Sequence, residues 1–334
     1  MNKKGKSLRV SALFKHREVT LVFMIVLLFV IISPLEPAFL SQSNIVSTLL
    51  SVALKGIIGI GTTLIIISGH LDLSVGGMVA AVCASFGFAY LKTESVFLAA
   101  CISLATALLF GVINAVLITK CRLSAFIATL ATMGITRGVT YVLTKGTPIK
   151  LTTLPDSYQK LGTMTIAHIP VIIIVFILLV IVFQVLLAKS KKFRQIIYTG
   201  SNGLTAQLSG VNTRKVIFTG YILIALLCWI AACLSSARFL TASPTYATSW
   251  ETDLIAAAVI GGATLDGGEG SLLGTALGLI LLGFVNSAIV FIGVSVYWQT
   301  FISNLVLLIA VLLDSFVEAR KKKDNESIIT IWRR

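Results

Sequence analysis

Long apolar runs constrain this chain more strongly than any other feature of its sequence. Runs of about 20 residues recur along it, and each could cross a hydrocarbon core of about 30 Å as a helix. A bilayer offers no water to pair with the backbone, so such runs fold as helices. With 57% hydrophobic and 12% charged residues and a mean hydropathy of +0.98, the 334-residue chain is far more apolar than a soluble domain. The sequence predicts an all-α polytopic membrane protein that forms a single bundle.

Positive charges predict which helix ends face the cytoplasm. Most of the 27 Lys and Arg residues gather in residues 1–18, in the turn at Lys120 and Arg122, in residues 189–215 and at the end of the chain. The positive-inside rule places all four regions in the cytoplasm, so the number of crossings is even. About ten crossings are expected, over residues 19–35, 45–68, 74–91, 96–119, 123–143, 166–188, 214–236, 252–265, 271–291 and 297–315.

This layout divides the chain into a basic cytoplasmic tail (1–18), a membrane domain (19–315) and a second basic cytoplasmic tail (316–334). The eighth run, residues 252–265, is short for a span of about 20 residues. It either spans the membrane or re-enters it, and the sequence alone leaves both alternatives open.

Two glycine-rich breaks interrupt the apolar runs. The first is SGHLDLSVGG, residues 68–77, in which glycines disfavour helix and Asp72 and Ser74 can pair with freed backbone donors. Non-helical backbone at membrane depth survives only beside protein or a water-filled cavity, so this break is expected near a translocation pathway. The alternative is a cytoplasmic turn in which Asp72 caps the next helix. The second break, GGATLDGGEGS at residues 261–271, resembles the first and raises the hypothesis of an internal repeat.

The connection between the sixth and seventh crossings is long for two packed helices, whose usual linker has 2–8 residues. Within residues 195–214 it contains a helix-compatible core from Gly203 to Leu208. Ser201 or Asn202 can cap this core, and Gly210 can stop it. A short cytoplasmic helix on a stiff bundle is a docking surface, and the alternative is a solvated connector.

A few polar side chains lie inside apolar runs. Arg137, about 14 residues into the fifth crossing, either snorkels to the headgroups or lines a solute path. Asn114, Asn286 and Gln299 are isolated amides that either join helices by hydrogen bonds or contact a hydroxylated solute.

Several motifs are absent. The sequence has no G-x-x-x-x-G-K-[ST] phosphate-binding motif and few carboxylates inside its spans for ion coupling. Its five cysteines show no CxxC spacing and its three histidines lie far apart, so neither a metal nor another cofactor is expected. No catalytic constellation appears, so the chain is not expected to be an enzyme. A pore driven by a separate ATPase is the main interpretation, and a stand-alone secondary carrier or facilitator is the alternative.

Five segments occur in the order found in one transporter family. Across about residues 20–315 the chain resembles the permease subunits of ribose-type sugar ABC importers, a family that includes permeases for xylose, galactose and autoinducer-2. The segments are SGHLDLSVGG, SAFIATLATMGITRG, GSNGLTAQLSGVN, LIAAAVIGGATLDGGEGSLLGTALG and GVSVYWQ.

The resemblance implies a dimeric pore in the bacterial inner membrane, homomeric or heteromeric. It also implies a cytoplasmic ATP-binding cassette subunit that hydrolyses ATP, and an extracytoplasmic binding protein that delivers a sugar or sugar-like solute. The residues expected at the pathway or gate are Gly69, Asp72, Ser74, Gly76, Asn114, Arg137 and Asn286. The residues expected in the loop that couples to the ATPase are Asn202, Gly203, Ala206, Gln207, Ser209, Gly210 and Arg214. The chain departs from the family pattern at His70, Asp266 and Glu269.

Overall fold

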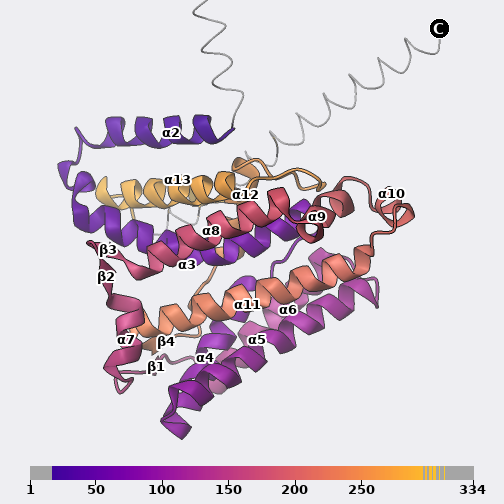
Figure 1. The fold of residues 1–334 in the computed structure, drawn as a ribbon. Helices are drawn as coiled ribbons and strands as arrows, with labels where there is room; N and C mark the ends of the chain where they lie inside the picture. Colours follow the sequence, from indigo (N-terminus) through magenta and orange to yellow (C-terminus); the bar gives the residue numbers. More distant parts are fainter. Residues whose placement is uncertain are drawn as a thin grey trace, which may run out of the picture.

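A computed structural model describes residues 17–295 and the single positions 298, 301, 302, 304, 305, 308 and 312. Among them, seven helices are long and apolar enough to cross a membrane. They lie side by side in Figure 1. These helices are α3 (Gln42–Ile67), α4 (Val75–Thr93), α5 (Val96–Thr119), α6 (Ala125–Thr144), α8 (Val171–Lys189), α11 (Thr213–Phe239) and α13 (Leu272–Phe291). The predicted helical, polytopic class is confirmed.

Two of the ten expected crossings form shorter helices. The first expected crossing, residues 19–35, lies in helix α2 (Arg17–Ile32), which at 1.5 Å per residue extends about 24 Å. The eighth is α12 (Trp250–Ile260), whose 11 residues extend only about 16 Å, so it cannot span the hydrocarbon core as a helix. Irregular backbone over residues 243–249 precedes it. The tenth expected crossing and both tails lie largely outside the described residues.

The small elements gather at the two ends of the bundle (Figure 1). One end carries α9 (Lys191–Ser201) and α10 (Gly203–Leu208), and we call it the α10 end. The opposite end, the α7 end, carries the one-turn 3-10 helix η1 and helix α7 with four short strands. These are η1 (Pro37–Leu40), α7 (Asp156–Thr163), β1 (Ile149–Lys150), β2 (Thr165–Ile166), β3 (Ile169–Pro170) and β4 (Thr241–Ala242).

Antiparallel pairing joins β1 to β4, with Ile149 opposite Ala242, and β2 to β3 in a hairpin. The expected crossing at residues 166–188 therefore begins later than predicted, at Val171, because residues 165–170 form this hairpin. Strands β1 and β4 join two segments that lie between the expected crossings.

Helix α3 occupies the centre of the bundle. Of an 18-residue window in α3, 89% of the residues are buried, against 22% for α5. Helix α3 packs against α8, α11, α12 and α13, while α5 and α6 present exposed apolar side chains such as Phe97 and Val142. Burial thus separates a central helix from helices whose outer faces suit a lipid environment.

Candidate functional site

Three glycine-bearing segments meet at the α10 end of the bundle. The Gly268 amide donates a hydrogen bond to the Ile67 carbonyl over 2.7 Å, which joins the second break to the end of α3. A Cβ atom on Gly200 would collide with the Ile67 carbonyl and lie 2.6 Å from the Gly268 nitrogen. A Cβ atom on Gly267 would lie 2.7 Å from the Gly69 nitrogen. We call this contact of residues 67–69, 200–201 and 266–268 the glycine junction.

The glycine junction fastens the end of α9 to both breaks at once. Because the contacts join backbone to backbone, no flexible side chain can absorb a displacement at this point. The two breaks that the sequence analysis paired are therefore neighbours in space. Gly69 itself has a φ of +80°, a left-handed conformation that glycine adopts without steric cost.

Asp72, Ser74 and Asn114, three of the predicted pathway residues, form one buried network. The Ser74 amide and hydroxyl both donate to Asp72 Oδ1, over 2.8 and 2.6 Å. The Asn114 amide nitrogen donates to the Ser74 hydroxyl over 2.8 Å. The interpretation of Asn114 as a residue that joins helices is confirmed, since this bond links α5 to the start of α4.

Asp72 is fully buried in the connection between α3 and α4, and burial raises the pKa of its carboxyl to about 6 against opposing hydrogen bonds from Ser74. Within the described residues, Asp72 Oδ2 and Asn114 Oδ1 have no hydrogen-bond partner. The Asp72 carboxylate accepts the Ser74 amide, as predicted for a freed backbone donor, whereas the N-cap of α4 is Ser74 and makes no side-chain capping bond. Residues 68 and 69 of the same break also lie in the glycine junction. Describing the break only as a turn that joins α3 to α4 is therefore incomplete.

Arg137 stabilises the irregular segment that precedes α12. Its guanidinium donates hydrogen bonds to the carbonyls of Pro244 and Tyr246, over 2.8 and 2.7 Å. The guanidinium thus turns toward residues 243–249 and pairs with backbone that has no helical partner. Both interpretations of Arg137, snorkelling to the headgroups and lining a path, stay predictions. Gly76, in the first turn of α4, lies against the Ala247 carbonyl. Two predicted gate residues thus contact the same non-helical segment.

Asn286 lies in a different place, on a polar cavity of about 360 Å³ between α3 and α13. Hydroxyl and amide side chains of α3 face it over successive turns, and the Ser287 hydroxyl donates to Asn44 Oδ1 over 2.7 Å. The polar residues that line this cavity include Asn44, Ser47, Thr48, Ser51, Lys55 and Asn286. The structure therefore separates Asn286 from the network around Asp72.

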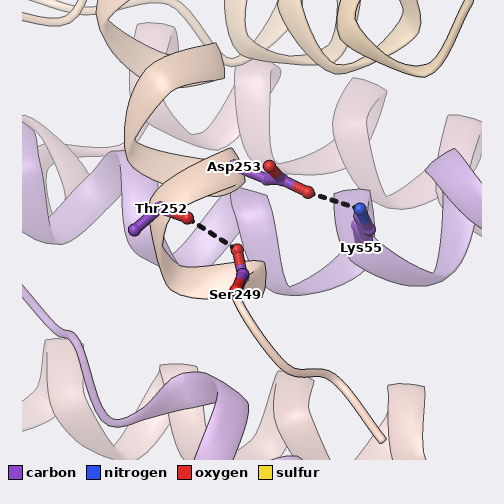
Figure 2. Close-up of polar contacts among 4 residues, drawn as sticks. All are labelled: Lys55, Ser249, Thr252 and Asp253. Atoms are coloured by element: carbon purple, nitrogen blue, oxygen red, sulfur yellow. Dashed lines mark hydrogen bonds and ion pairs between the residues drawn. The ribbon is translucent and has the colours of Figure 1, made fainter. Parts of the chain in front are cut away.

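Lys55 and Asp253 form an ion pair at the inner limit of this cavity, with Nζ and Oδ2 2.5 Å apart (Figure 2). The side chains are only 21% and 13% exposed. Asp253 lies in the first turn of α12, where the helix dipole favours a carboxylate. The Thr252 hydroxyl donates to the Ser249 carbonyl over 2.8 Å in the same turn (Figure 2).

The sequence analysis missed this pair. Its signal was a single lysine within the apolar run of residues 45–68, where an ionisable residue usually faces the interior of a bundle. The partner could not be found in the same way, because Asp253 lies 198 residues away.

Helix α10 is the short helix that the sequence analysis predicted, at the predicted residues Gly203–Leu208. Asn202 caps it by accepting a hydrogen bond from the Thr205 amide over 2.9 Å, and Gly210 has a left-handed φ of +85°. The Gln207 side chain donates to the Thr213 hydroxyl over 2.8 Å and holds α10 to the start of α11.

The exposed face of α10 is apolar. Ala206 is buried toward the bundle, whereas Leu204 and Leu208 are 71% and 82% exposed. Two leucines at a spacing of four lie on the same side of a helix. Ser209 and Arg214 lie exposed beside them. The sequence analysis singled out glycine, alanine and polar positions of this loop. It missed the leucines, which are common in helices and carry no signal without the fold.

Comparison with known proteins identifies related permeases. Residues 44–311 match the family described as branched-chain amino acid transport system / permease component. No solved structure matches the chain.

Curated relatives cover most of the chain. The ribose import permease protein RbsC of Bacillus subtilis is 37% identical over 288 residues, which cover 86% of this chain and 89% of the relative. RbsC of Haemophilus influenzae is 34% identical over 299 residues, or 89% of this chain and 93% of the relative. The L-arabinose ABC transporter permease protein AraH of Azospirillum brasilense is 29% identical over 304 residues, or 91% and 88%.

Proposed function

This chain belongs to the branched-chain amino acid transport system / permease component family, and we propose that it is the membrane-spanning pore of an ATP-driven sugar importer. One observation of the structure carries the proposal. An exposed apolar helix, α10, is fastened through the glycine junction to both breaks in the bundle. A partner that pushes on α10 would move the ends of α3 and α12 together.

The proposed partners follow from the two ends of the bundle. The α10 end is cytoplasmic and binds an ATP-binding cassette subunit through Leu204 and Leu208, with Arg214 beside them. The α7 end faces a binding protein outside the inner membrane of a bacterial cell and receives solute from it. A second permease, identical or paralogous, completes the pore. The basic tails are cytoplasmic, and the chain does not itself hydrolyse ATP.

The proposed mechanism is alternating access. ATP binding closes the partner ATPase, which displaces α9 and α10. The glycine junction passes this displacement to residues 67–69 and 266–268, since its contacts are between backbone atoms. Because α3 lines the cavity of about 360 Å³ and ends in the junction, its movement changes access to that cavity. Asp72, Ser74 and Asn114 hold the moving break together during the cycle.

A sugar or sugar-like solute fits the cavity better than the branched-chain amino acids in the family's description. Hydroxyls of Ser47, Thr48 and Ser51 and the amide of Asn286 line it, and such groups pair with the hydroxyls of a sugar. Ser47 and Thr48 donate hydrogen bonds to Asn44, and their hydroxyl oxygens can also accept hydrogen bonds from the hydroxyls of a sugar. Related permeases are named for ribose import and for L-arabinose ABC transport, which favours a sugar over a branched-chain amino acid and an ATP-driven importer over a stand-alone carrier.

Reconstitution tests the proposal. The chain is placed in proteoliposomes with the ATP-binding and binding proteins encoded beside its gene, and uptake of D-ribose and L-arabinose is measured. We expect accumulation that requires ATP and both partners. Equal uptake by the purified chain alone would contradict the proposal and favour a facilitator or secondary carrier.

A further inference from the structure

A second cavity lies beside the first and shares a wall with it. It has a volume of about 410 Å³ and lies between α3 and residues 239–250. Ser51 and Lys55 line both cavities. These residues are one helical turn apart on α3, so they face the same side. We call the two cavities together the vestibule, and the Lys55 side chain lies in the wall that they share.

The vestibule occupies the half of the bundle at the α7 end. Lys55 lies about 20 Å along α3 from Gln42, at 1.5 Å per residue. Every residue of α3 from position 56 to position 67 is buried. The vestibule thus ends at the ion pair of Lys55 and Asp253, which forms its floor, and close packing continues from there to the glycine junction.

Aromatic rings line the second cavity next to the floor. The Phe239 and Tyr246 ring centroids are 5.8 Å apart, and those of Tyr246 and Trp250 are 5.1 Å apart. The Lys55 ammonium lies 5.8 Å from the Trp250 ring centroid. Aromatic faces accept the apolar C–H faces of a solute, while the hydroxyls and charges around them accept its polar groups. This pairing of ring faces with hydrogen-bonding groups suits a polyhydroxylated ring.

The charges of the floor favour an uncharged solute. Lys55 and Asp253 neutralise each other, so the floor offers donors and acceptors without a net charge. An anionic solute would compete with Asp253 for the Lys55 ammonium and leave the Asp253 carboxylate in a shielded site without a partner, which is costly. A neutral hydroxylated solute can bind both groups while the ion pair persists.

We propose that the vestibule is a solute-binding site of the permease itself, in which the Lys55–Asp253 floor and the Trp250 ring hold a neutral polyhydroxylated solute. This inference rests on the proposed function and adds to it, because selection then occurs in the pore as well as in the binding protein. The competing explanation is that the ion pair only joins α3 to α12.

Binding to the full-length chain is tested in lipid nanodiscs. A variant with Trp250 as its single tryptophan is made by Trp229→Phe, Trp298→Phe and Trp332→Phe, and its fluorescence is titrated with D-ribose, L-arabinose and D-ribose 5-phosphate. We expect a saturable change with at least one neutral sugar and none with the phosphate. A matched variant that keeps only Trp229, which lines neither cavity, should not respond.

A double substitution distinguishes a role of the Lys55–Asp253 pair in solute binding from a role in joining α3 to α12. Lys55→Met leaves an unpaired carboxylate, whereas Lys55→Met with Asp253→Leu replaces both charges by apolar groups and restores packing. In the assembled importer we expect this double variant to keep its thermal stability. Uptake should still fall at least about tenfold, as after loss of hydrogen bonds to charged groups.

The outcomes separate this inference from the proposed function. The binding site is overturned if the wild-type importer takes up a sugar that leaves Trp250 fluorescence unchanged, or if the double variant shows full uptake. Either result is still compatible with the proposed function as an importer. A Trp250 response without ATP-dependent uptake supports the site and counts against the importer.

Discussion

The two ends of this bundle are built in opposite ways. At the α10 end, the glycine junction brings three backbone segments together with no side chain between them. At the α7 end, the vestibule is lined by polar, aromatic and aliphatic side chains from α3, α12, α13 and residues 239–250. Backbone contacts transmit a displacement rigidly, whereas side chains can adapt to a solute. The comparison suggests that one end transmits force and the other end binds.

The strongest test of the rigid end is Gly200→Ala. Its Cβ atom would collide with the Ile67 carbonyl, and backbone atoms cannot move aside independently. We expect uptake to fall by about two orders of magnitude or more, since overpacking typically costs about 1–3 kcal/mol and here also displaces the moving break. Transport by reconstituted importer is the measurement. Gly134→Ala, on α6, is the matched control, because nothing lies within 4 Å of its added Cβ atom.

The docking role of α10 predicts the next largest effect. Leu204→Asp with Leu208→Asp removes two exposed apolar side chains from the surface proposed to bind the ATPase. Binding of the ATP-binding subunit, measured by titration in nanodiscs, should weaken about 100-fold, because each buried leucine is worth about 1.5–3 kcal/mol. Leu161→Asp makes a similar change on α7 at the other end and should leave this affinity unchanged. Equal losses in both variants would remove α10 from the docking surface.

A moderate effect is expected where the vestibule wall is held in place. Arg137→Met removes the donor to the Pro244 and Tyr246 carbonyls, so the free energy of unfolding should fall by about 2 kcal/mol. Thermal denaturation in detergent measures this loss. Lys150→Met, an exposed cation on β1, is the control. An unchanged midpoint for Arg137→Met would mean that other groups hold residues 243–249.

The smallest effect is expected for Asp72→Asn. An asparagine keeps the oxygen that accepts the Ser74 amide, so uptake should change by less than about threefold, the effect of well under 1 kcal/mol. The pH dependence should differ. Burial raises the pKa of Asp72 to about 6, so the folded state holds its proton where the unfolded state has lost it. Wild-type stability should therefore decline as pH rises from about 4 to about 6, and this contribution should be absent in the variant. Denaturation midpoints across this range provide the measurement.

The long helices, the short helix α10 and the break between α3 and α4 could all be predicted from the amino-acid sequence. The length of the apolar runs fixed the long helices, and the positions of Asn202 and Gly210 fixed α10. Asp72 and Ser74 fixed the break between α3 and α4. Each of these follows from chemistry within a few residues of chain, such as backbone pairing, capping and the freedom of glycine.

Contacts between residues far apart in the sequence could be read only from the folded chain. It paired Lys55 with Asp253, placed the Arg137 guanidinium on the backbone of residues 243–249, and brought Gly200 against the Ile67 carbonyl. It also made the eighth expected crossing, residues 252–265, the short helix α12, which an irregular segment over residues 243–249 precedes. Hydrophobic periodicity tells which face of a helix is apolar, but not which helix lies against it or at what depth. Contacts between distant residues depend on that packing. The vestibule is made from four segments, so its one signal in the sequence is the single lysine, Lys55, within an apolar run.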